Sequence, residues 1–178
     1  GDYVTFVDSD YWISIEYIDK LHKLLKNSNA DISICNFIKT SQEDVQGEGS
    51  EEVIYEYSNN QALMKFFDEF YVQMVIAWGK LYKIHLFKEI SFPVGKLHED
   101  EFTTYKLIFN ADKIVLTTAQ LYYYWQRKDS IMGTGFNMKG RFDVIEAYRE
   151  RAAFFKKIGM EDASNKTYRA LFYICMDI

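Results

Sequence analysis

Hydrophobic and polar positions alternate along the chain in blocks whose spacing predicts strands and helices in turn. A short apolar run at 3–7 predicts a buried strand, and the mostly apolar, β-branched segment 31–40 predicts a second one. Between them, apolar residues three and four positions apart predict a helix over 15–27, with Ser14 as a candidate N-cap. The residues expected on its buried face are Ile15, Ile18, Leu21, Leu24 and Leu25.

The rest of the chain continues as α/β and gives way to a helical tail. Residues 75–84 fit either a strand or a helix, and Gly159 is placed to end the first of the two last helices. The other predicted elements are an exposed polar loop over 41–52, a strand over 53–57, a helix capped by Ser58 or Asn59 and reaching Tyr71, a helix over 99–110, strands over 113–118 and 121–126, and helices over 138–158 and 162–177.

Composition narrows the class of protein. The chain has 178 residues, of which 48% are hydrophobic and 17% aromatic, so a folded core is expected. The net charge of −5 argues against nucleic-acid binding, although it leaves an anionic nucleotide open if a metal supplies positive charge. Cys35 and Cys175 form no disulfide framework. With no apolar stretch near the roughly 20 residues of a membrane span and no leader, we expect a cytoplasmic location.

Two carboxylates one residue apart, Asp8 and Asp10, follow the first predicted strand directly. Residues i and i+2 of an extended or turning segment point the same way, so both carboxylates can face one site. Paired carboxylate oxygens suit a divalent cation that keeps water and also binds substrate phosphates. The alternative is a solvated Asp-Ser-Asp turn, which these residue types form readily.

Three blocks in the same order resemble family 2 glycosyltransferases with the GT-A fold, in particular bacterial members that build polysaccharides. The first block is Gly1 to Ile13, which contains the two carboxylates. The second is Ala77-Trp78-Gly79-Lys80-Leu81-Tyr82 followed by Phe92 to Glu101, and the third is Leu121 to Met132. The family usually has a third acidic residue where this chain has Tyr11.

The resemblance implies a mixed sheet flanked by helices that forms the C-terminal portion of a GT-A domain, with a C-terminal helical pair. Residues 1–135 would be the acceptor- and metal-binding portion, and 136–178 a helical extension. The N-terminal nucleotide-binding portion of the family would precede this chain. Cutting a sheet beside its strand at 3–7 leaves an edge, so we also expect dimerisation or a covered edge there.

The resemblance also assigns roles to acidic residues. Asp8 and Asp10 would hold a divalent cation, Mn²⁺ or Mg²⁺, with Asp10 the more direct ligand and Asp8 near the ribose or the metal. Asp100 would be the catalytic base that takes the acceptor's proton. Its position in the first turn of a helix favours its charge, whereas Glu99 and Glu101 oppose it, and the sign of the net pKa shift stays open. The alternative is an ordinary acidic helix N-terminus.

The second and third blocks supply further candidates. Arg127 and Ser130 lie where the family places polar groups near the donor's diphosphate, although Arg127 could equally be a surface residue. Trp78 would stack on acceptor sugars or fill the core, and Lys80 would reach an anionic acceptor or lie on the surface. The remaining candidates, His98 and Glu99, are placed beside the base, in contact with the acceptor or supporting the site.

The function that the resemblance implies is inverting, metal-dependent transfer of a sugar from a nucleotide-diphosphate sugar, expected to be a UDP-sugar, to a glycan or lipid-linked acceptor. The setting would be cell-surface polysaccharide synthesis at the inner face of the plasma membrane, and the last helices would pack on a partner subunit, on an upstream domain or on lipid as a peripheral membrane contact. Alone, this chain is expected to be inactive. Two alternatives stay open: a non-catalytic binding or scaffold remnant, and another phosphate-handling enzyme such as a nucleotidyltransferase.

Overall fold

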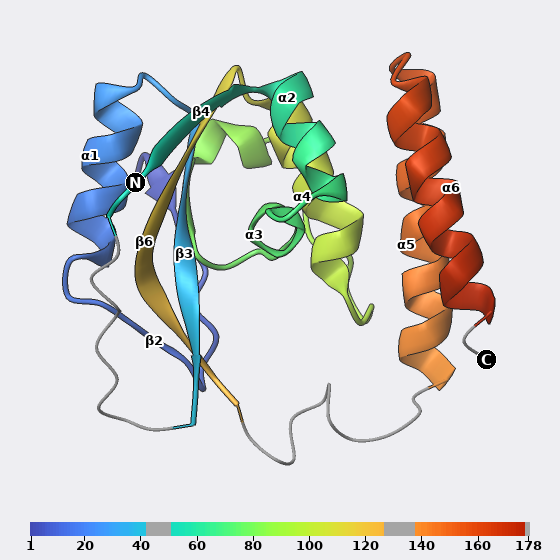
Figure 1. Cartoon of the computed structure of the whole chain (residues 1–178), viewed down its shortest axis with the longest axis horizontal. Helices are drawn as coiled ribbons and strands as arrows, with labels where there is room; N and C mark the ends of the chain where they lie inside the picture. Colours follow the sequence, from blue (N-terminus) through green and yellow to red (C-terminus); the bar gives the residue numbers. More distant parts are fainter. Residues whose placement is uncertain (42–50, 127–137, 177–178) are drawn as a thin grey trace.

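The structure, a computed structural model, describes residues 1–41, 51–126 and 138–176 and contains one mixed β-sheet with helices on both faces. Its strands run in the order β1-β5-β3-β6-β2, with β4 also paired to β6; Figure 1 labels β2, β3, β4 and β6 of this sheet. The β3–β6 pair is parallel, and the other pairs are antiparallel. The strands are β1 Tyr3–Val4, β2 Trp12–Ile13, β3 Ile32–Thr40, β4 Ile54–Ser58, β5 Lys80–Lys83 and β6 Lys113–Trp125.

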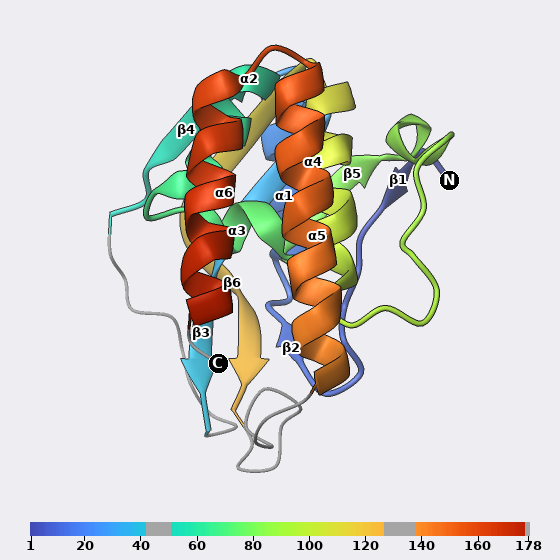
Figure 2. The ribbon, with the colours of Figure 1, turned by 90° about the vertical axis from the view of Figure 1, so that its right-hand side faces the viewer.

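Helices cover the two faces of this sheet unequally. One face packs against α1, and the other packs against α2, α3 and α4. In Figure 2, α5 lies beside α4, and α6 lies beside α5 in the opposite direction. The helices are α1 Tyr17–Asn27, α2 Asn59–Met64, α3 Tyr71–Val75, α4 Glu99–Asn110, α5 Met138–Lys157 and α6 Glu161–Met176, with 3₁₀ helices at Lys65–Phe67 and Ile84–Phe87. The predicted α/β class, mixed sheet and C-terminal helical pair are confirmed.

The helical pair shares the main core. Phe155 of α5 and Ala163 of α6 have no exposed surface and belong to the same buried cluster as Leu107 and Ile108 of α4. The predicted extension 136–178 is therefore packed onto the sheet domain over its described residues; the domain division itself stays a prediction. No helix within 1–41, 51–126 or 138–176 combines the length and apolar character that crossing a membrane requires.

The helix predicted over 15–27 begins later than expected. Ser14 does not cap it: the Ser14 hydroxyl accepts from the Glu16 amide, and α1 starts at Tyr17. Ile15 is fully exposed and Ile18 about half exposed, so assigning both to the buried face was wrong. The buried residues are instead Tyr17, Leu21 and Leu25, four positions apart, with Leu24 half-buried beside them.

The helix predicted to reach Tyr71 is interrupted. Ser58 caps α2 by accepting from the Gln61 amide, and the Gln61 side chain accepts from the Ser58 amide in return, as the Ser58 alternative predicts. At Asp68 the backbone becomes extended, and its carboxylate accepts from the Phe70 amide at 3.0 Å. This local hydrogen bond competes with the helix and separates α2 from α3.

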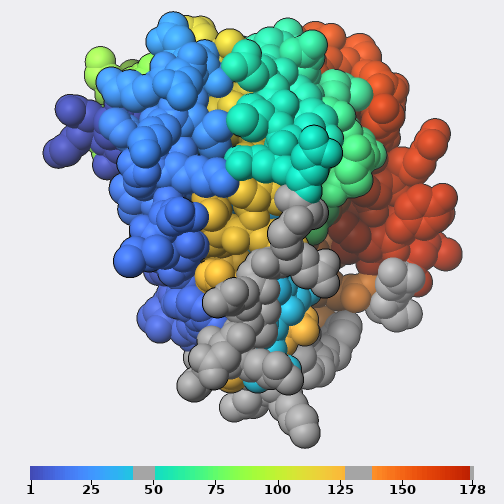
Figure 3. All heavy atoms as spheres, turned by 60° about the vertical axis from the view of Figure 1, so that its left-hand side comes forward, coloured from blue at the N-terminus to red at the C-terminus, as the bar shows by residue number. Residues whose placement is uncertain are grey.

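The two strands predicted over 113–118 and 121–126 are one strand, β6. Its first half pairs with β4 and its last residues pair with β2, while β3 runs parallel along its whole length. Two register shifts between Ile34 and Phe37 of β3 absorb the extra residues of β6. Figure 3 shows β6 reaching the surface between the N-terminal part of the chain and β4 with α2.

The strand predicted over 3–7 is shorter than expected, because only Tyr3 and Val4 pair, with Lys83 and Tyr82 of β5. Within the described residues, β1 stands at one end of the strand order. The ambiguous segment 75–84 holds the end of α3 and then β5. Gly159 adopts a φ of 79° just after α5, which confirms its predicted role as the end of that helix.

Candidate functional site

The two carboxylates that follow β1 lie in a tight turn. The Tyr11 amide donates to the Asp8 carbonyl at 3.1 Å, which closes the turn around Asp10. The Asp8 amide donates to the phenol oxygen of Tyr122 on β6 at 3.1 Å. Both carboxylates are exposed. The turn is therefore fixed to the sheet by its backbone while its two acidic side chains face solvent.

A second phenol holds the strand that leads into this turn. Thr5 and Tyr17 join their hydroxyls at 2.9 Å, and the Tyr17 hydroxyl also donates to the Lys80 carbonyl at 3.3 Å. Tyr17 is completely buried. It thus connects α1, β5 and the approach to the Asp8 turn.

One charge from its own turn and one from α4 act on Asp8. Partial desolvation raises the pKa of Asp8, and the negative charges of Asp10 and Glu99 raise it further. Glu99 is the first residue of α4, so this helix presents its N-terminal end to the Asp8 turn. The arrangement concentrates negative charge that a bound cation would relieve.

Asp100 lies one residue further along the same first turn and is half-buried. Burial raises its pKa from the ordinary value to about 7, and the charges of Glu101 and Glu99 add to the increase. The Glu101 amide donates to Asp100 Oδ1 at 2.9 Å and opposes the shift without cancelling it. A carboxyl group with a pKa near neutrality is a stronger base than an ordinary aspartate and is still ionised in part at pH 7.

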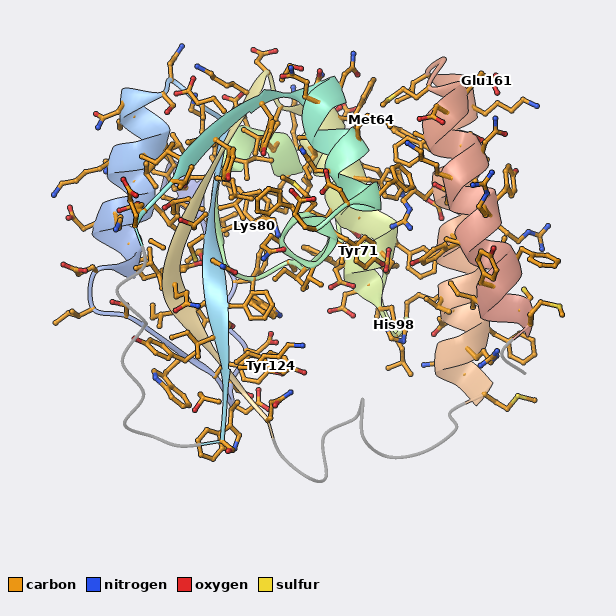
Figure 4. All side chains as sticks on the ribbon, in the orientation of Figure 1. Met64, Tyr71, Lys80, His98, Tyr124 and Glu161 are labelled. Carbon is orange, nitrogen blue, oxygen red and sulfur yellow. The ribbon has the colours of Figure 1, made fainter. Side chains whose placement is uncertain are left out.

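Lys80 faces the interior from β5 and has no exposed surface (Figure 4). Its ammonium group donates to the Ile76 carbonyl. Burial lowers its pKa to about 7, and attraction to Asp100 opposes that change. The surface location considered for Lys80 is wrong, and a soluble acceptor has no access to it in this conformation. Lys80 influences the site electrostatically, because its positive charge lowers the pKa of Asp100.

Aromatic rings form the wall behind the Asp8 turn. Trp78 is 9% exposed and stacks on Tyr122 with ring centres 4.4 Å apart, and it also stacks on Tyr124 at 5.8 Å. Tyr11 packs against the edge of Tyr122 and lies 4.8 Å from Tyr124. Of the two roles considered for Trp78, this packing favours the core role over acceptor stacking.

Of the other predicted site residues, the structure describes His98 and Glu99 and leaves Arg127 and Ser130 undescribed. His98 precedes the first turn of α4 in a left-handed conformation, with φ at 57° and its side chain making no cap hydrogen bond (Figure 4). Glu99 is exposed and acts on Asp8. Arg127 and Ser130 fall outside the described residues, so their predicted phosphate contacts stay predictions.

Sequence reasoning missed the residues that support the site. Tyr122 is one of three consecutive tyrosines, and alternation along a strand already predicts that Tyr122 and Tyr124 share a face opposite Tyr123. Glu101 appeared only as a like charge beside Asp100, whereas its carboxylate forms a buried ion pair with Arg151 of α5. No local pattern indicates a pair fifty residues apart.

The described residues supply only some of the ligands that a divalent cation needs. Among the described residues, no group of three or more His, Cys, Asp or Glu side chains is arranged to bind a metal ion. Asp8 and Asp10 alone fit a cation that takes its other ligands from substrate phosphates and water, as Mg²⁺ does in many phosphate-handling enzymes.

Comparison with known proteins gives one family model, "Glycosyl transferase family 2", which matches residues 1–91. Among curated proteins, the chain is 30% identical over 172 residues to glycosyltransferase GlyA of Streptococcus pneumoniae, covering 89% of this chain and 24% of that protein. It is 31% identical to glycosyltransferase GlyG of the same species, covering 85% of this chain and 52% of that protein. The chain therefore spans from about a quarter to about half of these relatives.

A third relative is the poly(ribitol-phosphate) beta-glucosyltransferase of Bacillus spizizenii, 28% identical over 72% of this chain and 20% of that protein. Among solved structures, S. aureus TarS 1–349 in complex with UDP-GlcNAc has a TM-score of 0.66 and 23% identity, covering 86% of this chain and 42% of that one. At this identity the likeness shows the fold, and it confirms the predicted GT-A-type α/β arrangement.

Proposed function

Because this chain belongs to glycosyl transferase family 2, whose model covers 91 of its 178 residues, we propose that its whole protein transfers a sugar from a nucleotide-diphosphate sugar to a glycan or lipid-linked acceptor. The observation that carries the proposal is the meeting of the Asp8 turn with the first turn of α4, where Asp100 has a pKa raised to about 7. Sugar transfer needs groups at both of these positions: one beside the leaving diphosphate and one beside the acceptor hydroxyl.

Asp100 is the base in this proposal. Its carboxylate takes the proton of the acceptor hydroxyl as that oxygen bonds to the anomeric carbon, and the bond from this carbon to the diphosphate oxygen breaks with its electron pair. A single displacement of this kind inverts the anomeric configuration. The raised pKa of Asp100 supports the role, because a base with a pKa near the working pH is ionised and still holds a proton well.

Asp8 and Asp10 would hold a divalent cation, Mn²⁺ or Mg²⁺, whose bound charge would offset that of the leaving diphosphate. Both side chains are exposed, and the pKa of Asp8 is raised in part by Asp10, which supports cation binding because the two carboxylates repel each other. Glu99 adds a third negative charge near the pair. Arg127 and Ser130 are proposed to contact the diphosphate.

The class of donor and acceptor is argued from relatives. TarS has been solved with UDP-GlcNAc and with UDP, which supports a UDP-sugar donor here. The name of the B. spizizenii relative specifies a polyol-phosphate acceptor, which supports an acceptor of the cell-surface polymer type. Synthesis of such polymers would place the protein in the cytoplasm at the inner face of the membrane, with the C-terminal helices as the peripheral contact.

The deciding experiment measures release of nucleoside diphosphate from UDP-sugars by the whole protein, with Mn²⁺ or Mg²⁺ and a polymer acceptor. Asp10→Ala and Asp100→Asn are each expected to lower kcat by about 100-fold or more, because each removes a group that acts on the reacting atoms. Asp2→Asn, which alters an exposed aspartate near the same strand, serves as the matched control. Full activity in Asp100→Asn would contradict the assignment of the base.

The alternatives give different results in the same series. If the whole protein binds no nucleotide sugar, the chain is a non-catalytic remnant that serves as a binding or scaffold module. Exchange of label between pyrophosphate and a nucleotide would instead indicate a nucleotidyltransferase.

The exposed edge of the sheet adds a proposal about assembly. Within the described residues, β1 pairs with β5 alone, and an unpaired edge invites pairing with another strand. We therefore expect a homodimer through β1 or a further segment that covers this edge. Light scattering combined with hydrogen exchange tests this: a monomer whose Tyr3 amide, on the side of β1 away from β5, exchanges freely would contradict it.

A further inference from the structure

Helix α5 holds the first turn of α4 through a buried ion pair. Arg151 of α5 donates to the carboxylate of Glu101, the third residue of α4, and both residues are buried, with 1% and 7% of their surface exposed. The same carboxylate accepts from the hydroxyl of Tyr71, which in turn meets the Tyr148 hydroxyl at 2.8 Å. The guanidinium also lies 4.3 Å from the Tyr148 ring centre. Glu101 is thus held by groups from α3 and α5.

A second set of contacts holds the segment just before α4. The Leu97 amide donates to Asp143 Oδ2 at 2.9 Å, and the ammonium of Lys96 donates to Asp143 Oδ1 at 3.0 Å. One turn earlier on α5, Lys139 donates to the Gly95 carbonyl at 2.6 Å. The Leu97 amide and the Lys96 charge hold the pKa of Asp143 below its ordinary value, so this carboxylate stays ionised at neutral pH.

Between these two anchored points lie only three residues, His98, Glu99 and Asp100. His98 adopts the left-handed backbone conformation, which a side chain other than glycine takes at a cost. Such a conformation persists only where the surroundings fix it, and here residues 97 and 101 are both tied to α5. The geometry of α5 therefore sets where the Asp100 carboxyl lies.

We propose that Arg151 and Asp143 of α5 are positioning residues for Asp100: they fix the two ends of the segment that carries it. The proposal rests on the function proposed above, in which Asp100 is the base. It gives α5 a part in sugar transfer that its distance in sequence from the Asp8 turn does not suggest.

Packing alone gives no reason for an ion pair at this place. A buried ion pair is costly to desolvate, and an apolar pair of similar volume is often as stable or more stable. A charged, hydrogen-bonded pair is directional, because Glu101 accepts from both Arg151 and Tyr71. Directional contacts fix the orientation of the helix turn, which apolar side chains fix less closely.

The test uses variants that remove the contacts without leaving a lone buried charge. The double variant Glu101→Gln/Arg151→Met keeps the side-chain volumes and leaves no unpaired charge, so it is expected to fold. Asp143→Ala removes the second anchor. The matched control is Glu150→Gln, which removes a different α4–α5 ion pair, that between Lys106 and Glu150, two turns away from Asp100.

The first readout is amide hydrogen exchange along α4 in this chain, and it needs no activity. The backbone amide of residue 101, which donates to Asp100 Oδ1 and to the His98 carbonyl, is expected to exchange about tenfold faster in both test variants, while the Ile108 amide near the end of the helix keeps its rate. Faster exchange at both amides would indicate general loosening of the helix and would overturn the proposal. Glu150→Gln is expected to leave the Glu101 amide unchanged.

The second readout is transfer by the whole protein. Misplacement of a reacting group by about 1 Å costs about 100-fold in rate, so kcat is expected to fall by about 10- to 100-fold in the test variants while the KM for the donor is unchanged. Unchanged kcat with a loosened first turn would overturn the positioning role. Failure of the function proposed above gives a different result. In that case Asp100→Asn would retain full activity, independently of the outcome for the α5 variants.

Discussion

Lys80 on β5 and Asp100 in the first turn of α4 attract each other across the protein interior. Burial raises the pKa of Asp100 to about 7 and lowers that of Lys80 to about 7, and the attraction between the two groups opposes both shifts. Because the base must be ionised to take a proton, we expect kcat to rise as the pH increases through about 7.

Lys80→Met tests this relationship. The variant removes a positive charge that lowers the pKa of Asp100, so that pKa should rise further and the ascending limb of the pH–rate profile should move to higher pH. Lys88→Met, at an exposed lysine, is the control and should leave the limb in place. A limb that moves to lower pH in Lys80→Met would refute the coupling.

Cation binding should begin to weaken at a higher pH than the pKa of an ordinary aspartate would predict. The pKa of Asp8 is raised, so protons compete with the cation for it, and the apparent Kd for Mn²⁺ in the presence of UDP should begin to increase at a higher pH than it would with an ordinary aspartate. Calorimetric titration at several pH values measures this.

The same titration separates the contribution of Glu99. Glu99→Gln removes one charge that raises the pKa of Asp8, so the loss of binding should begin at a lower pH than in the unmodified protein. Asp2→Asn should reproduce the unmodified curve. If Mn²⁺ binds equally well at every pH, Asp8 is not a ligand.

Tyr122→Phe should weaken cation and nucleotide binding without unfolding the chain. The substitution removes the phenol oxygen that accepts the Asp8 amide, and loss of one such hydrogen bond costs about 1 kcal/mol, or about fivefold in affinity. Tyr123→Phe is the matched control, because Tyr123 lies on the other face and stacks on Trp12 at 5.4 Å. Equal effects of the two substitutions would contradict a specific role for Tyr122.

Ser58→Ala should lower the free energy of unfolding by about 1 kcal/mol, because it removes the side chain that accepts from the Gln61 amide at the start of α2. Asn60→Ala, at an exposed position in the same turn, should have little effect. Urea denaturation followed by circular dichroism compares the two. An unchanged midpoint in Ser58→Ala would show that the cap contributes no net stability.

Local sequence patterns predicted those elements whose signals lie within a few residues. The boundaries of α4 and the Ser58 cap both depend on adjacent residues, and both agree with the structure. By contrast, the prediction of separate strands over 113–118 and 121–126 left a break at Ala119 and Gln120, inside what the structure shows to be one strand, β6. In the structure, the Thr118 amide donates to the Val53 carbonyl, and this tertiary contact keeps the strand continuous.

The candidate site divides in the same way. Asp8, Asp10 and Asp100 were found because two short motifs carry them, whereas their supports depend on contacts between distant segments. Tyr122 lies 114 residues from Asp8. The burial of Lys80 was equally hidden, since one lysine in a short strand carries no signal of its environment and is exposed in most proteins.

The register shifts between β3 and β6 make the site sensitive to chain length. Successive strand residues face opposite sides, so deletion of one residue between Leu116 and Tyr122 would turn Tyr123 towards the Asp8 turn in place of Tyr122. The hydroxyl that receives the Asp8 amide would then point away. Side chains along β6 can therefore be exchanged one at a time. Adding or removing a residue there would break the hydrogen bond that attaches the acidic turn to the sheet.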